Sequence, residues 1–130
     1  MKIRLKNSLK KSIMVLSGTF FAASMLFILA AFALGKYTIV FFYADWNLSC
    51  RESKPLIESV AGTYNNISLV EVNIDQPSAP GQARSLGLSL PRSIPHIYVL
   101  DNNNKVVTDF TYAGESSQQL KARLDNIVLR

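Results

Sequence analysis

An apolar strand followed at once by a turn and a helix start is the feature that most constrains the fold of this chain. The strand is the seven-residue run from Tyr37 to Tyr43, made almost wholly of β-branched and aromatic residues, which favour strands. A continuous apolar run is typical of a strand covered on both faces of a largely parallel sheet. Ser49 and Glu52 then form a capping-box pattern, which predicts a helix start. We therefore expect a strand, a turn and a helix over residues 37–64.

The rest of the pattern predicts an α/β domain with the order β-α-β-α-β-β-α. Further strands are expected at Leu69–Ile74, Ile97–Leu100 and Lys105–Tyr112. A turn from Pro77 to Gly81 should lead into a short helix that ends near Leu86, and a last helix should follow a second capping box at Ser116 and Gln119. The Asp101–Asn104 turn should join the last two strands as a hairpin. Such an order predicts a mixed sheet, with parallel strands first, an antiparallel hairpin last and helices on both faces.

The N-terminal region predicts a membrane anchor ahead of this domain. Residues 1–12 carry five Lys or Arg and no acid, and the 22 residues from Ile13 to Leu34 are uncharged. As a helix this run would be roughly 33 Å long, enough to cross a bilayer. The basic start predicts a cytoplasmic N-terminus, with residues 35–130 on the far side, in the periplasm or thylakoid lumen. A signal peptide cleaved after Ala33 is the alternative, although its apolar region would usually be shorter.

The net charge of +5 does not indicate a nucleic-acid partner, because the excess lies in one place. Residues 35–130 hold nine Lys or Arg and nine Asp or Glu, so the excess belongs to the basic segment, where membrane orientation explains it. His96 is the only histidine and Cys50 the only cysteine, so we expect no metal site, no cofactor and no intramolecular disulfide.

Five short segments together resemble the thioredoxin family. They are Phe42-Tyr43-Ala44-Asp45-Trp46, Cys50-Arg51-Glu52 with Pro55, Val72-Asn73-Ile74-Asp75, Ile94-Pro95-His96, and Gly114. Within the family the chain is most similar to membrane-anchored members that face the thylakoid lumen or periplasm and are implicated in cytochrome maturation. The resemblance implies a minimal thioredoxin-like fold that lacks the first strand and helix of a full thioredoxin.

The resemblance also locates an active-site turn that has lost one of its two sulfurs. Where the family has Trp-Cys-x-x-Cys, this chain has Trp46-Asn47-Leu48-Ser49-Cys50. Dithiol exchange needs one thiolate to attack a substrate disulfide and a second thiol to release the mixed disulfide, and Asn47 cannot attack. Cys50 is expected in the first turn of a helix, where the dipole would lower its pKa. In the family this second cysteine is shielded, which favours an inert thiol.

Other site residues follow from the same resemblance. Pro95 is expected to form a cis peptide bond, with Ile94 pairing its backbone with a bound segment and Trp46 flanking the turn, either as a partner contact or as packing. Phe41 stands where many thioredoxins have a buried aspartate. His96 is either structural or an acid–base group, and no partner for it is visible in the sequence.

Two functions remain open at this point. The leading one is a membrane-tethered module that has lost dithiol exchange and holds a polypeptide or thiol-containing protein in the groove of Trp46, Ile94 and Pro95. The alternative is a monothiol oxidoreductase that works through Cys50 in redox homeostasis or cytochrome maturation.

Overall fold

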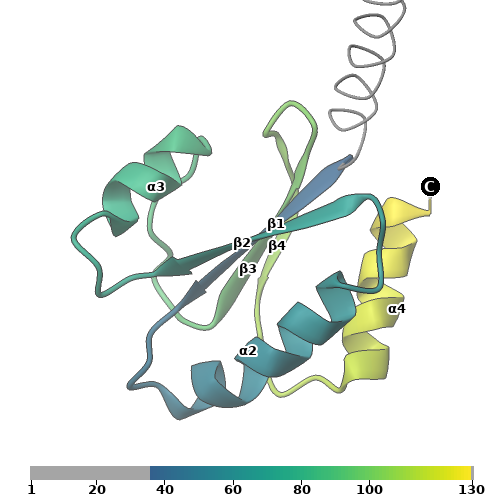
Figure 1. Cartoon of the computed structure of the whole chain (residues 1–130), viewed down its shortest axis with the longest axis horizontal. Helices are drawn as coiled ribbons and strands as arrows, with labels where there is room; N and C mark the ends of the chain where they lie inside the picture. The colour runs from purple at the N-terminus through teal and green to yellow at the C-terminus, as the bar shows by residue number, and fades with distance from the viewer. Residues whose placement is uncertain (1–35, 130) are drawn as a thin grey trace, which may run out of the picture. The chain divides into compact units, whose positions relative to one another are not determined.

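A computed structural model describes residues 36–129, and Figure 1 shows the arrangement of their helices and strands. The elements are β1 (Tyr37–Tyr43), α2 (Leu48–Ala61), β2 (Ile67–Asn73), α3 (Ala79–Ser85), β3 (His96–Asp101), β4 (Val106–Thr111) and α4 (Ser117–Val128). The predicted order β-α-β-α-β-β-α is confirmed.

The strands form one mixed sheet in the order β2-β1-β3-β4. β1 runs parallel to β2, with Val40 opposite Val70, and antiparallel to β3, with Val40 opposite Tyr98. β3 and β4 form the antiparallel hairpin. Since β1 lies between two other strands and under helices on both sides, residues Ile39 to Phe42 are all at most 2% exposed, which explains its continuous apolar sequence.

Helices cover both faces of the sheet, as predicted (Figure 1). Alternate side chains of a strand point to opposite faces, so Phe41 packs in one core with Ile57 of α2 and Leu124 of α4. Phe42 packs on the other face, in a core that includes Ala83 of α3. One strand therefore supplies both hydrophobic cores.

The two long helices begin with side-chain caps, one of which was predicted wrongly. In α4 the capping box of Ser116 and Gln119 is present, with backbone-to-side-chain bonds of 3.2 and 2.9 Å. In α2 the N-cap is Asn47, whose Oδ1 accepts the Cys50 N–H at 3.0 Å, and Ser49 already lies inside the helix. Both residue types cap well, but the backbone of Asn47 is extended and it directly precedes the first helical residue.

The basic segment 1–12 and the anchor expected at residues 13–34 lie outside the described residues. Between residues 36 and 129, no helix combines the length and the apolar character needed to cross a membrane.

Candidate functional site

The predicted site residues lie around one end of the sheet. β1 ends at Tyr43 and leads into the turn before α2, and β3 starts at His96, which is the register partner of Phe42. A small pocket of about 190 Å³ at this end is lined by Trp46, Ile74, Pro91, Arg92, Ser93 and Ile94. The structure therefore brings Trp46 and Ile94, which are far apart in the sequence, to the walls of one hollow.

The Ile94–Pro95 peptide bond is cis, as the resemblance implied. Pro95 is buried, and its carbonyl oxygen accepts the Tyr112 N–H at 2.9 Å. Ile94 lies before β3, and within residues 36–129 its own backbone N–H and C=O have no backbone hydrogen-bond partner. These two groups can therefore pair with an extended segment of another polypeptide.

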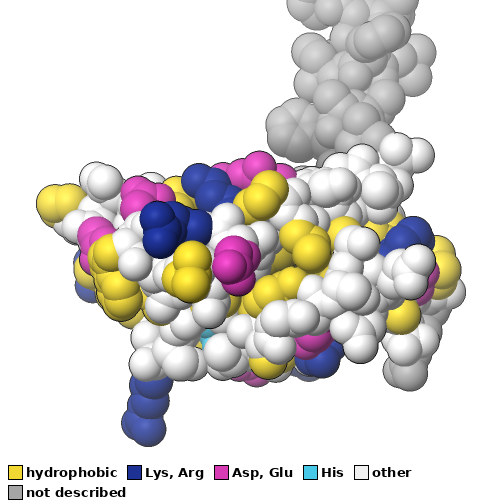
Figure 2. Space-filling view, turned by 90° about the horizontal axis from the view of Figure 1, so that it is seen from below, with side chains coloured by type: hydrophobic (Ala, Val, Ile, Leu, Met, Phe, Trp, Pro, Cys, Tyr) yellow, Lys and Arg dark blue, Asp and Glu magenta, His cyan; other side chains and the backbone are white. Residues whose placement is uncertain are grey.

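Trp46 is 67% exposed, which favours the partner-contact reading over packing. Leu48, two residues further on, is also exposed. Figure 2 shows hydrophobic side chains spread among charged ones over the face that is seen from below. An exposed indole at the rim of a pocket offers apolar contact area at low conformational cost.

Asn47 is part of the helix start rather than a reactive group. Its N–H donates to the Ala44 carbonyl at 3.2 Å and its carbonyl accepts the Arg51 N–H at 3.1 Å, while its side chain caps the Cys50 N–H. All three bonds fix the turn between β1 and α2. A neutral amide in this position has no thiolate chemistry.

Cys50 is buried, with 1% of its surface exposed. The expectation that the helix start lowers its pKa is wrong, because burial raises the pKa of the Cys50 thiol above its ordinary value. A backbone hydrogen bond at Ala44 opposes this shift, and the negative charge of Asp45 adds to it. Burial favours the neutral form of an acid, so the thiol stays protonated and shielded at neutral pH.

His96 has partners that the sequence did not reveal. Its Nε2 lies 2.9 Å from Asp109 Oδ2 and its Nδ1 lies 3.1 Å from Thr111 Oγ1, both on β4. Ser93 Oγ lies 3.0 Å from the same threonine oxygen. These bonds connect β3, β4 and the loop before β3, which favours the structural role for His96.

Two further residues near the site, Asp45 and Phe41, have structural contacts. Asp45 is exposed and accepts a hydrogen bond from Asn73 Nδ2 at 3.2 Å, which ties the turn to β2. Phe41 is fully buried and stacks on Tyr43, with 5.4 Å between the ring centroids. Across the described range, no group of three His, Cys, Asp or Glu side chains is arranged to hold a metal ion.

A larger pocket of about 520 Å³ is lined by a different set of residues. They are Tyr37, Val107, Thr108, Arg123, Asn126 and Ile127. Tyr37 begins β1, whereas the predicted site follows the end of β1. None of the predicted site residues lines this larger pocket.

Comparison with known sequences gives a family match over most of the chain. The family model described as Thioredoxin matches residues 30–126. A thioredoxin of Chlamydia pneumoniae is 26% identical over 76 residues, which cover 58% of this chain and 70% of that protein. The thioredoxin-like protein HCF164, chloroplastic, of Oryza sativa subsp. japonica is 35% identical over 72 residues, or 55% of this chain. This chain spans only 26% of the rice protein's length.

Solved structures show the same fold at low sequence identity. A mutant thioredoxin from Halobacterium salinarum NRC-1 has a TM-score of 0.55 and 18% identity, covering 71% of this chain and 74% of its own. A thioredoxin-2 described as a component of the malaria parasite protein secretion machinery has a TM-score of 0.55 and 21% identity, covering 70% and 82%.

Proposed function

The chain belongs to the thioredoxin family, and from this premise we propose that it is a membrane-tethered polypeptide-binding module that has lost dithiol exchange. One observation carries the proposal: the residue at the nucleophile position, Asn47, is a helix cap, while the surviving thiol of Cys50 is buried. The scaffold around the site is kept, and the groups that would exchange electrons with a disulfide are absent or shielded.

The retained function that we propose is binding of an extended segment beside Trp46 and Ile94. The exposed indole and the pocket supply apolar contacts, and the unpaired backbone of Ile94 supplies hydrogen bonds. Because backbone pairing does not depend on side chains, the partner class is a polypeptide, which includes thiol-containing proteins.

The tether and the compartment are proposed from the sequence. The uncharged run from Ile13 to Leu34 and the basic residues before it favour a single span with the domain outside the cytoplasm. We propose the thylakoid lumen or the periplasm as this compartment, and the rice relative, described as chloroplastic, is compatible with the first.

A disulfide-reduction assay tests the loss of exchange. The full chain in detergent micelles, supplied with a disulfide-bonded protein and dithiothreitol, should reduce no faster than dithiothreitol alone. Its matched control, Cys50→Ser, should behave the same way. Turnover comparable to that of a two-cysteine thioredoxin would contradict the proposal. Asn47→Cys restores the Cys-x-x-Cys spacing with Cys50, so it should raise the rate above background.

Binding has a built-in reporter, because Trp46 is the only tryptophan of the chain. Adding a tryptophan-free unfolded polypeptide should shift its emission to shorter wavelength as the indole leaves water. Ile94→Asp should abolish the shift, whereas Val107→Asp, in the other pocket, should keep it. An unresponsive emission, or an equal response in Ile94→Asp, would contradict groove binding.

The monothiol alternative requires an accessible Cys50 thiolate. Both the burial of this side chain and its raised pKa weigh against that requirement. The alkylation measurement described in the Discussion separates the two functions.

A further inference from the structure

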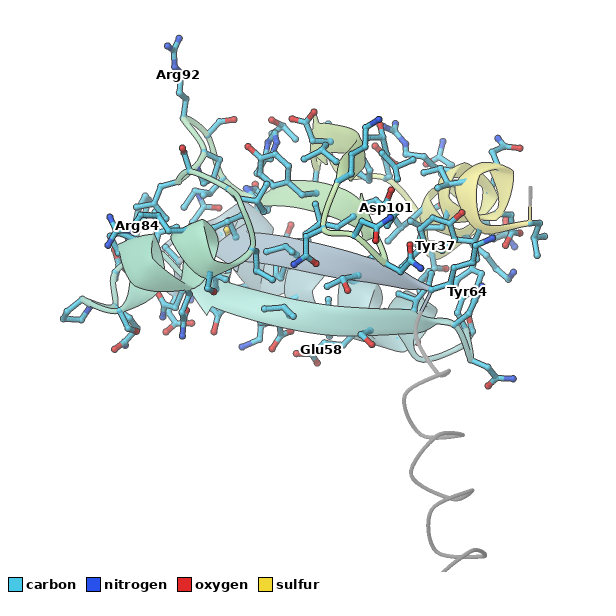
Figure 3. All side chains as sticks on the ribbon, turned by 90° about the horizontal axis from the view of Figure 1, so that it is seen from above. Tyr37, Glu58, Tyr64, Arg84, Arg92 and Asp101 are labelled. Carbon is cyan, nitrogen blue, oxygen red and sulfur yellow. The ribbon has the colours of Figure 1, made fainter. Side chains whose placement is uncertain are left out.

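The strand β2 forms an open edge of the sheet in residues 36–129, because it pairs with β1 on one side only. Figure 3 shows β2 as the outermost strand. Two hydrogen bonds at the ends of this pair show which β2 residues face β1. The Tyr37 N–H donates to the Asn66 carbonyl, and the Ile74 N–H donates to the Tyr43 carbonyl. Backbone groups alternate in direction along a strand. The N–H and C=O groups of Ile67, Leu69 and Glu71 therefore point away from β1. The N–H of Asn73 does so too, whereas its C=O accepts the Gln76 N–H at 3.1 Å.

This edge lacks most of the features that protect exposed strands from pairing. It is seven residues long, without proline or lysine, and its only charged residue is Glu71. Short length, proline, lysine, bulges and inward-pointing charged side chains are the usual protections, and Glu71 is the one that this edge has. The side chains of Leu69 and Val70 are half-buried, although each packs against one of the two cores. A strand added beside β2 would cover both.

The side chain of Glu71 lies on the α2 side of this edge, and one of its carboxyl oxygens lacks a hydrogen bond within residues 36–129. Its Oε1 is buried and has no hydrogen-bond partner among the described residues. Burial raises the pKa of Glu71 most, hydrogen bonding with the carboxyl group of Glu58 and the charge of that group add to the rise, and the charge of Lys54 opposes it. Glu58 lies alongside β2 in Figure 3. The Lys54 Nζ is instead 3.4 Å from the Tyr43 hydroxyl and 4.4 Å from the centre of its ring.

We propose that the β2 edge binds an extended segment of a partner protein, which adds a strand beside β2 and places a Lys or Arg side chain opposite Glu71. The outward backbone groups supply the hydrogen bonds of strand addition. Directly opposed side chains in neighbouring strands are about 5 Å apart, so a cation there reaches the carboxyl groups of Glu71 and Glu58. This surface shares no residue with the pocket of Trp46 and Ile94, although Ile74 at the pocket follows directly after β2. Its occupation does not depend on the function proposed above.

Charge argues for a different protein rather than a second copy of this chain. β2 contains no Lys or Arg, so two copies paired through this edge would offer no cation to either Glu71. They would instead bring two pairs of carboxyl groups to one interface. Like charges on neighbouring strands oppose pairing, and a basic strand removes that opposition.

Two blocked peptides test the proposal on the full chain in detergent micelles. The probe TVTKTVT alternates Thr on one face with Val, Lys and Val on the other, and the control replaces Lys with norleucine. The lysine peptide should bind about ten-fold more tightly, as expected of a hydrogen bond to a charged group. Glu71→Gln should remove this difference. Amide exchange should slow at Leu69, Glu71 and Asn73, and not at the inward-facing Val70.

Leu69→Pro provides a second variant, because it removes an outward N–H and leaves the pairing with β1 intact. It should weaken both peptides alike, and the Glu71→Gln comparison stands even if this variant does not fold. Equal affinity of the wild type for the two peptides, exchange protection at Ile94 instead of β2, or dimers through β2 in sedimentation would each overturn the proposal. Because the peptide readout is at β2 and the Trp46 emission reports the pocket, failure of one surface is distinguishable from failure of the other.

Discussion

At the scale of single residues, Asn47 has a defined structural role as the N-cap of α2. Its side chain satisfies a helix N–H that would otherwise lack a partner. We expect Asn47→Ala to lower the free energy of unfolding by about 1 kcal/mol, the usual cost of losing an N-cap. Asn47→Asp should keep the stability, and Ser49→Ala should have little effect because Ser49 is not the cap. Urea unfolding of the three variants tests this assignment, and equal losses at both positions would contradict it.

The second prediction at this scale concerns Cys50. Because its pKa is raised above the ordinary value of 9.0, the thiolate fraction at a given pH is smaller than that of a free thiol. Alkylation by iodoacetamide in the folded state should be slow at pH 7 and should rise only above pH 9, while denaturant should release fast labelling. Fast labelling of the folded chain with an inflection below the free-thiol range would instead favour the monothiol function.

The sequence was informative about these residues where the signal was local. The short segments that resemble the thioredoxin family placed Asn47 in the turn and implied the cis bond before Pro95. Burial depends on packing of distant elements, so the helix position of Cys50 predicted its pKa in the wrong direction. The partners of His96 lie on the next strand, and finding them required the exact register of the hairpin.

At the scale of elements, the sequence predicted every helix and strand of the described range, because each carries strong periodicity or a turn signal. The α2 start was misplaced for a physical reason. Asn47 and Ser49 are both good caps two residues apart, and only the backbone path out of β1 decides between them. The exposed edge of β2 was also not predicted, since strand order is a tertiary property.

The carboxyl pair on β2 and α2 makes stability depend on pH. The folded state raises the pKa of Glu71 from the ordinary 4.5, so it binds the proton more tightly than the unfolded state. The folded state therefore becomes less stable relative to the unfolded state as the pH rises from about 4.5 through the raised pKa of Glu71. Glu71→Gln should remove this loss. The difference in free energy of unfolding between the variant and the wild type should therefore shift in favour of the variant as the pH rises across this window. Below the window, the difference should stay constant. Unfolding curves from pH 4 to pH 8 measure the difference, and a constant difference would contradict the assignment.

At the scale of the whole domain, two cores share the single strand β1. Small domains with such shared packing unfold in one step. Leu124 is 1% exposed in the core under α2 and α4, so Leu124→Ala should cost about 2–5 kcal/mol and should lower the stability of the opposite core with it. Leu90→Ala, at an exposed position, is the matched control. Amide exchange that accelerates only around α4 would show that the two cores open separately.

Tyr37 and Trp46 lie near opposite ends of β1, so the length of this strand sets the distance between them. Seven strand residues extend about 23 Å, and the flanking strands keep that span stiff. The pocket of Trp46 and Ile94 therefore stays at a nearly constant distance from Lys36. A ligand that touches both ends of β1 at once would have to span this length.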